Sequence, residues 1–483
     1  MAAGVFLVAL LVYLATGPTA PESHDAVPSA YIPVSLLGDG DLAFSPSEAP
    51  IMFLWRDPAA RQPVAIEVPS WRQVAEGSGE SFGARRMQGG LVLLGPRYYL
   101  TQTVRTSSVN GEPLFASIFG PAAGLTALPV AAAAGALGAN LQEDHWSVAR
   151  VAKWTAALLA AGSAAMVYLT AAALTTPRRA LLVAAVYALG SCIWMISSRS
   201  LWQQTPELFF LSLGTLCLVR GESAWLRGAA AGLAFAAAAA CRPTAMLPAL
   251  AGAGYLALSD RRCLAAFVAA AVPIALGVLA YNQYYFGSLL DFGQVKVGAP
   301  LAVLKTGSPE LWQTPLWVGA AGLLASPSRG LLVYSPFFAA AFAGAVIAWR
   351  DPRYARLRFL TVAVPALWLP AFAWFDWWGG WTYGYRPIVD SVPLLAVLCV
   401  PAIDRAVGRP AWRLALAAAA GWSIFVQVIG VAGYHPADWN ARVSSPGAAP
   451  ADIDRPEHRA RLWSLRDSQI GYLIALLAGQ RQR

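Results

Sequence analysis

The chain has 483 residues, of which 57% are hydrophobic and only 13% are charged, with a mean hydropathy of +0.51. A soluble domain carries about 25% charged residues, so this composition excludes that class and indicates a polytopic membrane protein. The net charge of +9 comes from small arginine clusters between apolar segments, without the basic and aromatic surface that single-stranded nucleic acid requires. We therefore expect no nucleic-acid partner. The five scattered cysteines indicate neither a disulfide framework nor a metal site.

The first apolar stretch makes residues 1–17 the first expected transmembrane helix. Its length also fits the core of a signal peptide, but it lacks a basic leading region and further apolar segments follow, so we expect an uncleaved span. Residues 18–117 are polar and are expected to form a folded periplasmic loop of mixed structure, with interfacial helices and a hairpin over 90–104. The amphipathic segment 31–37 is expected to lie along the membrane surface.

Residues 118–434 are expected to form an all-α transmembrane domain, with about 11–13 transmembrane or re-entrant helices in the whole chain. Several apolar segments are shorter than the roughly 20 residues that span a bilayer. The pair broken at 241–243 and the segment 314–326 are therefore expected to line a cavity that covers their freed backbone groups. The polar residues 435–483 are expected to form a periplasmic tail. The apolar segments are 118–138, 151–174, 181–198, 204–219, 228–241, 244–258, 263–283, 314–326, 331–349, 357–374, 387–403 and 412–434.

The arginines indicate an orientation. Alternate loops carry thirteen arginines and should face the cytoplasm, because cytoplasmic loops are enriched in Lys and Arg. These loops are 175–180, 220–227, 259–263, 350–358 and 405–413. The opposite set should face the periplasm, and it comprises 199–206, 241–243, 284–313 and 375–387. If the loop 18–117 lies on that same side, segment 118–138 must dip in and return, or one span is miscounted.

An acidic residue follows the first span closely, in the sequence Glu22-Ser-His-Asp25. A carboxylate at the membrane interface suits a general base that acts on a polar acceptor while a lipid-borne donor stays in the bilayer. Asp25 is therefore the candidate catalytic residue, and Tyr31 in the segment behind it is a candidate donor contact. The alternative is that Asp25 only caps the interfacial helix.

A dense aromatic cluster surrounds two glycines and an arginine in the run from Trp374 to Arg386. A planar guanidinium is a natural clamp for phosphate oxygens, and aromatic faces stack on sugar rings. The alternative is an aromatic belt at the membrane interface. The candidate ligand contacts of this cluster are Trp378, Trp381, Tyr383 and Arg386.

Other polar residues lie beside apolar segments. Glu207 either assists the chemistry or complements the dipole of its helix, and Arg329 either reaches a phosphate or extends to the interface. Asp39 and Asp41 could hold a divalent cation, Mg²⁺ or Mn²⁺, that bridges donor phosphates. An acid-Gly-acid sequence is, however, more often an exposed turn.

These features together resemble the multi-spanning glycosyltransferases of the C fold class (GT-C), which include bacterial relatives of protein O-mannosyltransferases and of lipid A aminoarabinose transferases. The likeness rests on four stretches: Glu-Ser-His-Asp25, Pro-Val-Ser-Leu-Leu-Gly-Asp-Gly-Asp-Leu behind it, Phe-Gly-Pro121, and Trp-Trp-Gly-Gly-Trp-Thr-Tyr-Gly-Tyr-Arg386. The resemblance implies a donor sugar on a polyprenyl phosphate, transfer at the outer face and Asp25 as the base. It also implies that Arg386, with Arg242 and Arg329 behind it, holds the donor phosphate.

The chain departs from that class in two places. Glu207, after Gln203-Gln204, stands where a clear second acid is expected, and Tyr385 stands where relatives tend to have proline. These departures leave donor geometry and any need for a metal open.

We therefore expect an inverting glycosyltransferase of the bacterial inner membrane. Its partners would be a polyprenyl-phosphate-sugar donor, a lipid, glycan or protein acceptor, and the membrane lipids. A transporter or flippase of a lipid-linked substrate is one alternative, and it predicts charged residues at mid-membrane depth. A non-catalytic membrane scaffold is the other.

Overall fold

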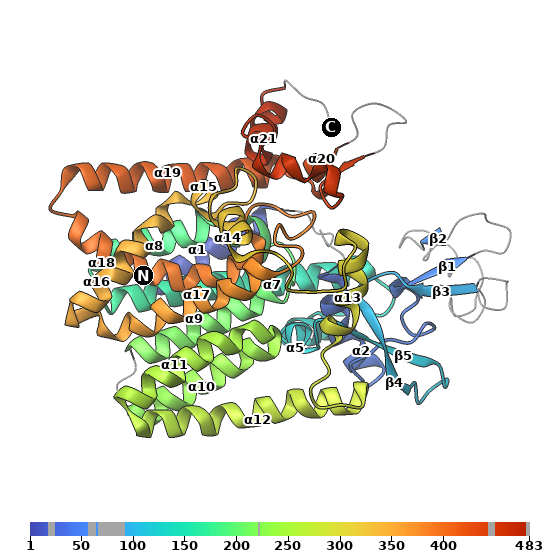
Figure 1. The fold of residues 1–483 in the computed structure, drawn as a ribbon. Helices are drawn as coiled ribbons and strands as arrows, with labels where there is room; N and C mark the ends of the chain where they lie inside the picture. The colour runs from blue at the N-terminus through green and yellow to red at the C-terminus, as the bar shows by residue number, and fades with distance from the viewer. Residues whose placement is uncertain (18–24, 57–63, 66–91, 221–222, 443–449, 480–483) are drawn as a thin grey trace.

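The computed structural model describes residues 1–17, 25–56, 64–65, 92–220, 223–442 and 450–479. They are mostly helical and form a bundle with a smaller part of mixed structure at one end (Figure 1). The bundle contains α1 (Ala2–Ala15), α7 (His145–Ala172), α8 (Pro177–Leu189), α9 (Gln204–Arg220), α10 (Ala224–Cys241), α11 (Met246–Ser259), α12 (Arg261–Phe286), α14 (Leu316–Ala325), α15 (Leu331–Tyr334), α16 (Ala339–Arg350), α17 (Arg358–Ala373), α18 (Val392–Ala406) and α19 (Pro410–Gly433).

Within the described residues, six helical segments are long and apolar enough to cross a membrane. They are 145–172, 224–241, 261–286, 352–373, 386–406 and 410–433. The expected helical membrane protein is confirmed at this level. The count of 11–13 transmembrane or re-entrant helices stays a prediction, because the remaining apolar helices are shorter.

Close packing in the bundle depends on small residues. Gly228 and Gly232 lie one turn apart on α10 and face α12. A Cβ atom at Gly228 would lie 2.1 Å from the carbonyl oxygen of Cys263, and one at Gly232 would lie 2.0 Å from that of Phe267. This small-xxx-small spacing lets two helix backbones approach closely, as is common among membrane helices.

The insert after α1 contains α2 (Val27–Gly38) and two small antiparallel sheets. Strand β1 (Phe53–Arg56) pairs with β2 (Val64–Ala65) and with β3 (Val92–Pro96), whereas β4 (Leu100–Thr106) pairs with β5 (Pro113–Ser117). The expected hairpin over 90–104 is therefore wrong, because its two strands belong to different sheets. The hairpin forms one strand later, where Gly111, with a φ of +71°, helps to close the turn between β4 and β5.

Helix α2 forms where the amphipathic segment was expected, but protein covers most of it. Every residue from 27 to 33 is buried, and α2 packs against α5 (Ala122–Leu125) and α7. The helix is therefore covered by protein rather than exposed on one face, and its position relative to the membrane surface stays a prediction. Its composition explains this burial, because small and apolar residues lie on all sides of the helix.

Segment 118–138 does not form a spanning helix. It contains only α5 and α6 (Leu128–Ala136), and the nine residues of α6 extend about 14 Å, roughly half the thickness of a bilayer core. The chain thus leaves α1, forms the insert and returns through α7 from the same end of the bundle (Figure 1). The insert therefore lies at this end of the bundle, and segment 118–138 adds no further crossing of the membrane.

The arginine-rich loops meet at the other end of the bundle. Arg179 and Tyr354 both bond the carboxylate of Asp404, and Arg356 donates to the carbonyl of Val219. Arg227 pairs with Asp260 in the same way. The expected grouping of these loops is confirmed, whereas the side of the membrane that they face stays a prediction.

Two segments expected to be loop or tail contain further structure. The region 284–313 includes α13 (Gly293–Thr306). The tail contains α20 (Pro436–Asn440), a pair of two-residue strands, β6 (Ala441–Arg442) and β7 (Ala451–Asp452), and the helices Pro456–Trp463 and α21 (Gln469–Leu477). Helix α21 packs against α19, so this part of the tail is docked on the bundle.

Candidate functional site

A cavity of about 1120 Å³ lies where the insert meets the bundle. The helices α12 and α17 contribute an apolar wall, and other segments contribute polar and charged residues. Arg242 and Pro243 line it, as expected for the broken helix pair, whereas no residue of 314–326 does. The residues of the apolar wall are Ile274, Gly277, Val278, Leu367, Pro370 and Ala371.

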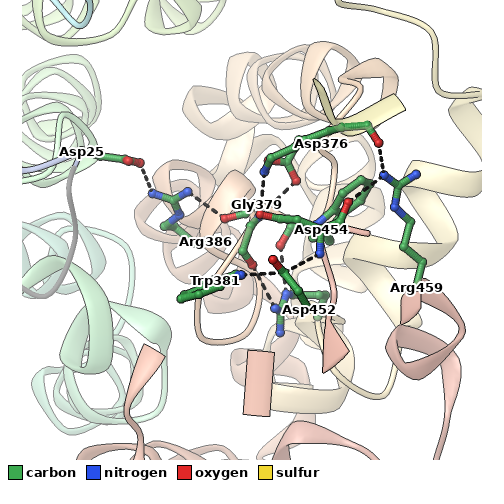
Figure 2. Close-up of polar contacts among 12 residues, drawn as sticks. Asp25, Asp376, Gly379, Trp381, Arg386, Asp452, Asp454 and Arg459 are labelled. Atoms are coloured by element: carbon green, nitrogen blue, oxygen red, sulfur yellow. Dashed lines mark hydrogen bonds and ion pairs between the residues drawn. The ribbon is translucent and has the colours of Figure 1, made fainter. Parts of the chain in front are cut away.

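Asp25 and Arg386 form an ion pair in the wall of this cavity. Arg386 Nη1 lies 2.8 Å from Asp25 Oδ2, and Arg386 Nη2 donates to the carbonyl oxygen of Gly379 at 2.8 Å. Figure 2 shows the guanidinium between these two acceptors. The guanidinium also lies over the ring of Trp202, with Cζ 4.4 Å from its centroid. Arg386 is thus held in one orientation beside the candidate base.

The local sequence explains how Arg386 reaches this position. Gly379, Gly380 and Gly384 have φ values of +74°, +66° and +55°, a left-handed conformation that strains residues with a Cβ. These turns fold the loop back, so that the carbonyl of Gly379 faces Arg386 and Trp381 lies at the cavity. The glycines of the aromatic cluster are therefore required by its backbone.

A second ionic group joins three segments at the cavity. Lys305 Nζ, on α13, lies close to the carboxylates of Asp376 and Asp454, at 2.5 and 3.0 Å. Burial opposes the ammonium charge, but these two acids outweigh it and raise the pKa of Lys305. Burial and the charge of Asp376 raise the pKa of Asp454. This group ties α13 to the aromatic loop and to the C-terminal tail.

A third ionic group lies at the edge of the cavity. Arg242 bonds the carboxylate of Asp390, and its Nη1 lies 3.7 Å from Glu207 Oε2. Glu207 is fully buried and does not line the cavity. Arg242 therefore faces two carboxylates, whereas Arg386 has an ion pair only with Asp25 among the described residues.

The cavity brings together Asp25, Arg386, Arg242 and Trp381 from the nine candidates for catalysis and donor binding, and leaves out the other five. Arg329 is completely buried and donates to the carbonyls of Trp378, Ser328 and Gly380 and to Asn440 Oδ1. Arg329 therefore holds the aromatic loop from inside the protein and does not extend to the membrane interface. The other four outside the lining are Glu207, Tyr31, Trp378 and Tyr383.

The aromatic candidates outside the lining have structural contacts. Trp378 donates from Nε1 to Asp454 at 2.9 Å, and Tyr383 donates to the carbonyl of Val426. Tyr31 bonds His145 and lies in a separate pocket of about 190 Å³. A dense aromatic sequence therefore mixes residues that hold the loop with Trp381, which faces the cavity.

The residues expected to hold a metal do not fit one. Asp41 accepts hydrogen bonds from the Ser35 hydroxyl and from the backbone N–H of Ala43, so its carboxylate serves the local turn. Neither Asp39 nor Asp41 lines the cavity. Among the residues that the structure describes, no group of three His, Cys, Asp or Glu side chains could share an ion.

Some residues that line the cavity were not predicted from the sequence. Lys305 comes from a region that was interpreted as a loop, and Asp454 comes from the expected tail. Tyr99 lies between β3 and β4. Burial, followed by the charge of Asp25, raises the pKa of Tyr99 to about 12 and keeps its phenol protonated. The lysine that directly follows the apolar run 297–304 was the one available signal for Lys305.

In comparisons with known proteins, no family model matches the chain and no curated protein matches it significantly. The functional interpretation therefore depends on the residues and their geometry.

Proposed function

We propose that this protein is a membrane glycosyltransferase that moves a sugar from a polyprenyl-phosphate carrier to an acceptor. The observation that carries the proposal is the Asp25–Arg386 pair, which places a carboxylate and a guanidinium 2.8 Å apart in one cavity. A transfer of this kind needs a proton acceptor near the acceptor hydroxyl and a cation near the leaving phosphate.

Arg386 is the best phosphate ligand of the three cations at the cavity. Lys305 and Arg242 each face two carboxylates, which neutralise their charge. Arg386 faces Asp25, and its buried Nε has no hydrogen-bond partner among the described residues. A phosphate oxygen would satisfy that donor, and a guanidinium binds phosphate in a geometry that an ammonium cannot copy.

The apolar wall supports a lipid-linked donor. Helix α12 is the least buried of the six candidate spans, with 17% of its most apolar stretch buried, so most of its surface is left for lipid. Its inner residues Ile274 and Val278 line the cavity. A prenyl chain could lie along this wall while its phosphate reaches Arg386. A water-soluble donor without a lipid chain would gain no binding free energy from such an apolar wall.

The step is an attack by the acceptor hydroxyl oxygen on the anomeric carbon of the sugar. The new C–O bond forms as the bond from that carbon to the phosphate oxygen breaks, with inversion at the carbon. The hydroxyl proton passes to Asp25, and the bonding electron pair leaves with polyprenyl phosphate. Arg386 stabilises the charge that develops on the phosphate, and the low dielectric of the cavity strengthens this effect.

The proposed setting is the periplasmic face of a bacterial inner membrane. The arginine-rich loops lie at the end of the bundle remote from the insert (Figure 1), and such loops favour the cytoplasm.

The test is transfer of radiolabelled sugar from a panel of polyprenyl-phosphate donors by the purified protein in lipid. Asp25→Asn should reduce transfer about 100-fold or more, as the loss of a general base does. Asp260→Asn is the matched control, because the Arg227–Asp260 pair has the same 2.8 Å separation and similar exposure at the opposite end. Asparagine also keeps the helix cap that Asp260 provides.

Two results would overturn the proposal. Full transfer by Asp25→Asn would remove the base assignment. Absence of transfer from every polyprenyl-phosphate donor, with intact folding, would favour a transporter or a scaffold.

A further inference from the structure

The polar side of the cavity contains buried polar atoms that have no hydrogen-bond partner among the described residues. Four of them lie on adjacent segments at the start of α9 and just after α10: Trp202 Nε1, Gln203 Oε1, Gln204 Oε1 and Thr244 Oγ1. Gln204 is only 5% exposed and Trp202 only 8%. Burying such groups without partners is unfavourable, so the site favours a ligand that bonds them.

These atoms lie next to the proposed phosphate ligand. The ring of Trp202 is in contact with the guanidinium of Arg386. The Arg242–Glu207 contact joins the first turn of α9, where Gln204 lies, to the segment that carries Thr244. In a sugar phosphate the sugar ring is bonded directly to the phosphate. A phosphate on Arg386 would therefore bring its sugar against this group.

The polar atoms of these four side chains are uncharged. An amide offers both a donor and an acceptor, as a sugar hydroxyl does, and the indole N–H and the threonine hydroxyl complement them. The acid nearest in sequence, Glu207, is fully buried and does not line the cavity, and Arg242 is already paired with Asp390. An ammonium or carboxylate on the sugar would be buried here without an opposite charge, which is costly.

We propose that Trp202, Gln203, Gln204 and Thr244 form the sugar subsite of the cavity, and that it selects a neutral sugar through its hydroxyl groups. This inference rests on the proposed function and specifies its substrate class. It excludes amino sugars and uronic acids as preferred donors.

The test measures equilibrium binding of four lipids to the full chain in nanodiscs of phosphatidylethanolamine and phosphatidylglycerol. The lipids are polyprenyl phosphate alone and the same lipid bearing a neutral hexose, an amino sugar or a uronic acid. We expect the neutral hexose lipid to bind more tightly than the bare phosphate and the two charged sugars.

The variant Gln203→Leu/Gln204→Leu should weaken binding of the hexose lipid about tenfold, the effect of losing one or two neutral hydrogen bonds. Its affinity for bare polyprenyl phosphate should stay within twofold of wild type, which also reports that it is folded. Gln427→Leu is the control, because Gln427 is fully buried on α19 and does not line the cavity. Gln204→Glu keeps the side-chain size and should shift preference toward the amino-sugar lipid.

The outcomes separate the two proposals. Equal weakening for bare and glycosylated lipids, or no preference for the neutral sugar in wild type, would overturn the sugar subsite and leave the proposed function intact. If wild type binds neither polyprenyl phosphate nor its sugar derivatives, both proposals fail together.

Discussion

Asp25 and Arg386 are 361 positions apart in the chain, and their side chains form an ion pair of 2.8 Å in the wall of the cavity. The pair joins the segment after the first helix to the loop before a late span. Each partner orients the other, and a donor phosphate would compete with Asp25 for the same guanidinium.

Two replacements of Arg386 should distinguish the contribution of its charge to transfer from that of its planar shape. Arg386→Gln removes the charge-assisted bonds and should lower kcat/KM about 10- to 100-fold, since a hydrogen bond to a charged group contributes about 1.5–3 kcal/mol. Arg386→Lys keeps the charge but loses the planar fork and the contact with Trp202, and should give an intermediate value. The measurement is transfer kinetics with varied donor.

Arg227→Gln serves as the control for these variants, because it breaks the matched pair with Asp260 at the opposite end. A loss of activity as large in Arg227→Gln as in Arg386→Gln would mean that both changes act through folding.

The buried Arg329 should matter for stability. Its guanidinium bonds three carbonyls and Asn440, and a Met side chain would leave these acceptors unsatisfied. Arg329→Met should lower the free energy of unfolding by about 3 kcal/mol, measured in detergent by thermal or steric-trap unfolding. If Arg329→Met is as stable as wild type but does not bind the donor, Arg329 would instead be a phosphate ligand.

The insert should respond to pH through Asp39. Burial, followed by the charges of Glu48 and Asp41, raises the pKa of Asp39 from 3.8 to about 6. The folded state therefore holds this proton to higher pH than the unfolded chain, so the contribution of Asp39 to stability falls as pH rises from 3.8 to about 6.

Asp39→Asn removes this dependence. Thermal unfolding followed between pH 4 and pH 7 should show a smaller loss of stability with rising pH in the variant than in wild type. Parallel curves for the two proteins would contradict the prediction.

Orientation can be tested with single cysteines. Glu310→Cys lies near the cavity end and Gly408→Cys lies at the arginine-rich end, and both positions are exposed. An impermeant maleimide added to intact bacterial cells should label the first variant and spare the second until the membrane is opened. The native cysteines are buried or partly buried, which keeps background labelling low. The reverse pattern would invert the proposed topology.

Local chemistry in the sequence was enough to find part of the site. Asp25 stands out because an acid follows an apolar span closely, and Arg386 because a lone cation ends an aromatic and glycine-rich run. The same reasoning also selected Arg329 and Tyr383, because burial within the protein depends on which segments pack over a residue. It missed Lys305 and Asp454, which meet only when α13 and the tail fold onto the aromatic loop.

The sequence by itself determined the membrane class, the approximate positions of the apolar helices and the grouping of arginine-rich loops, because hydropathy and charge act locally along the chain. The tertiary structure decided which strands pair, that 118–138 does not span, and which charges share the cavity. Those features depend on contacts between segments far apart in the chain, such as Asp25 and Arg386, whose proximity no local pattern encodes.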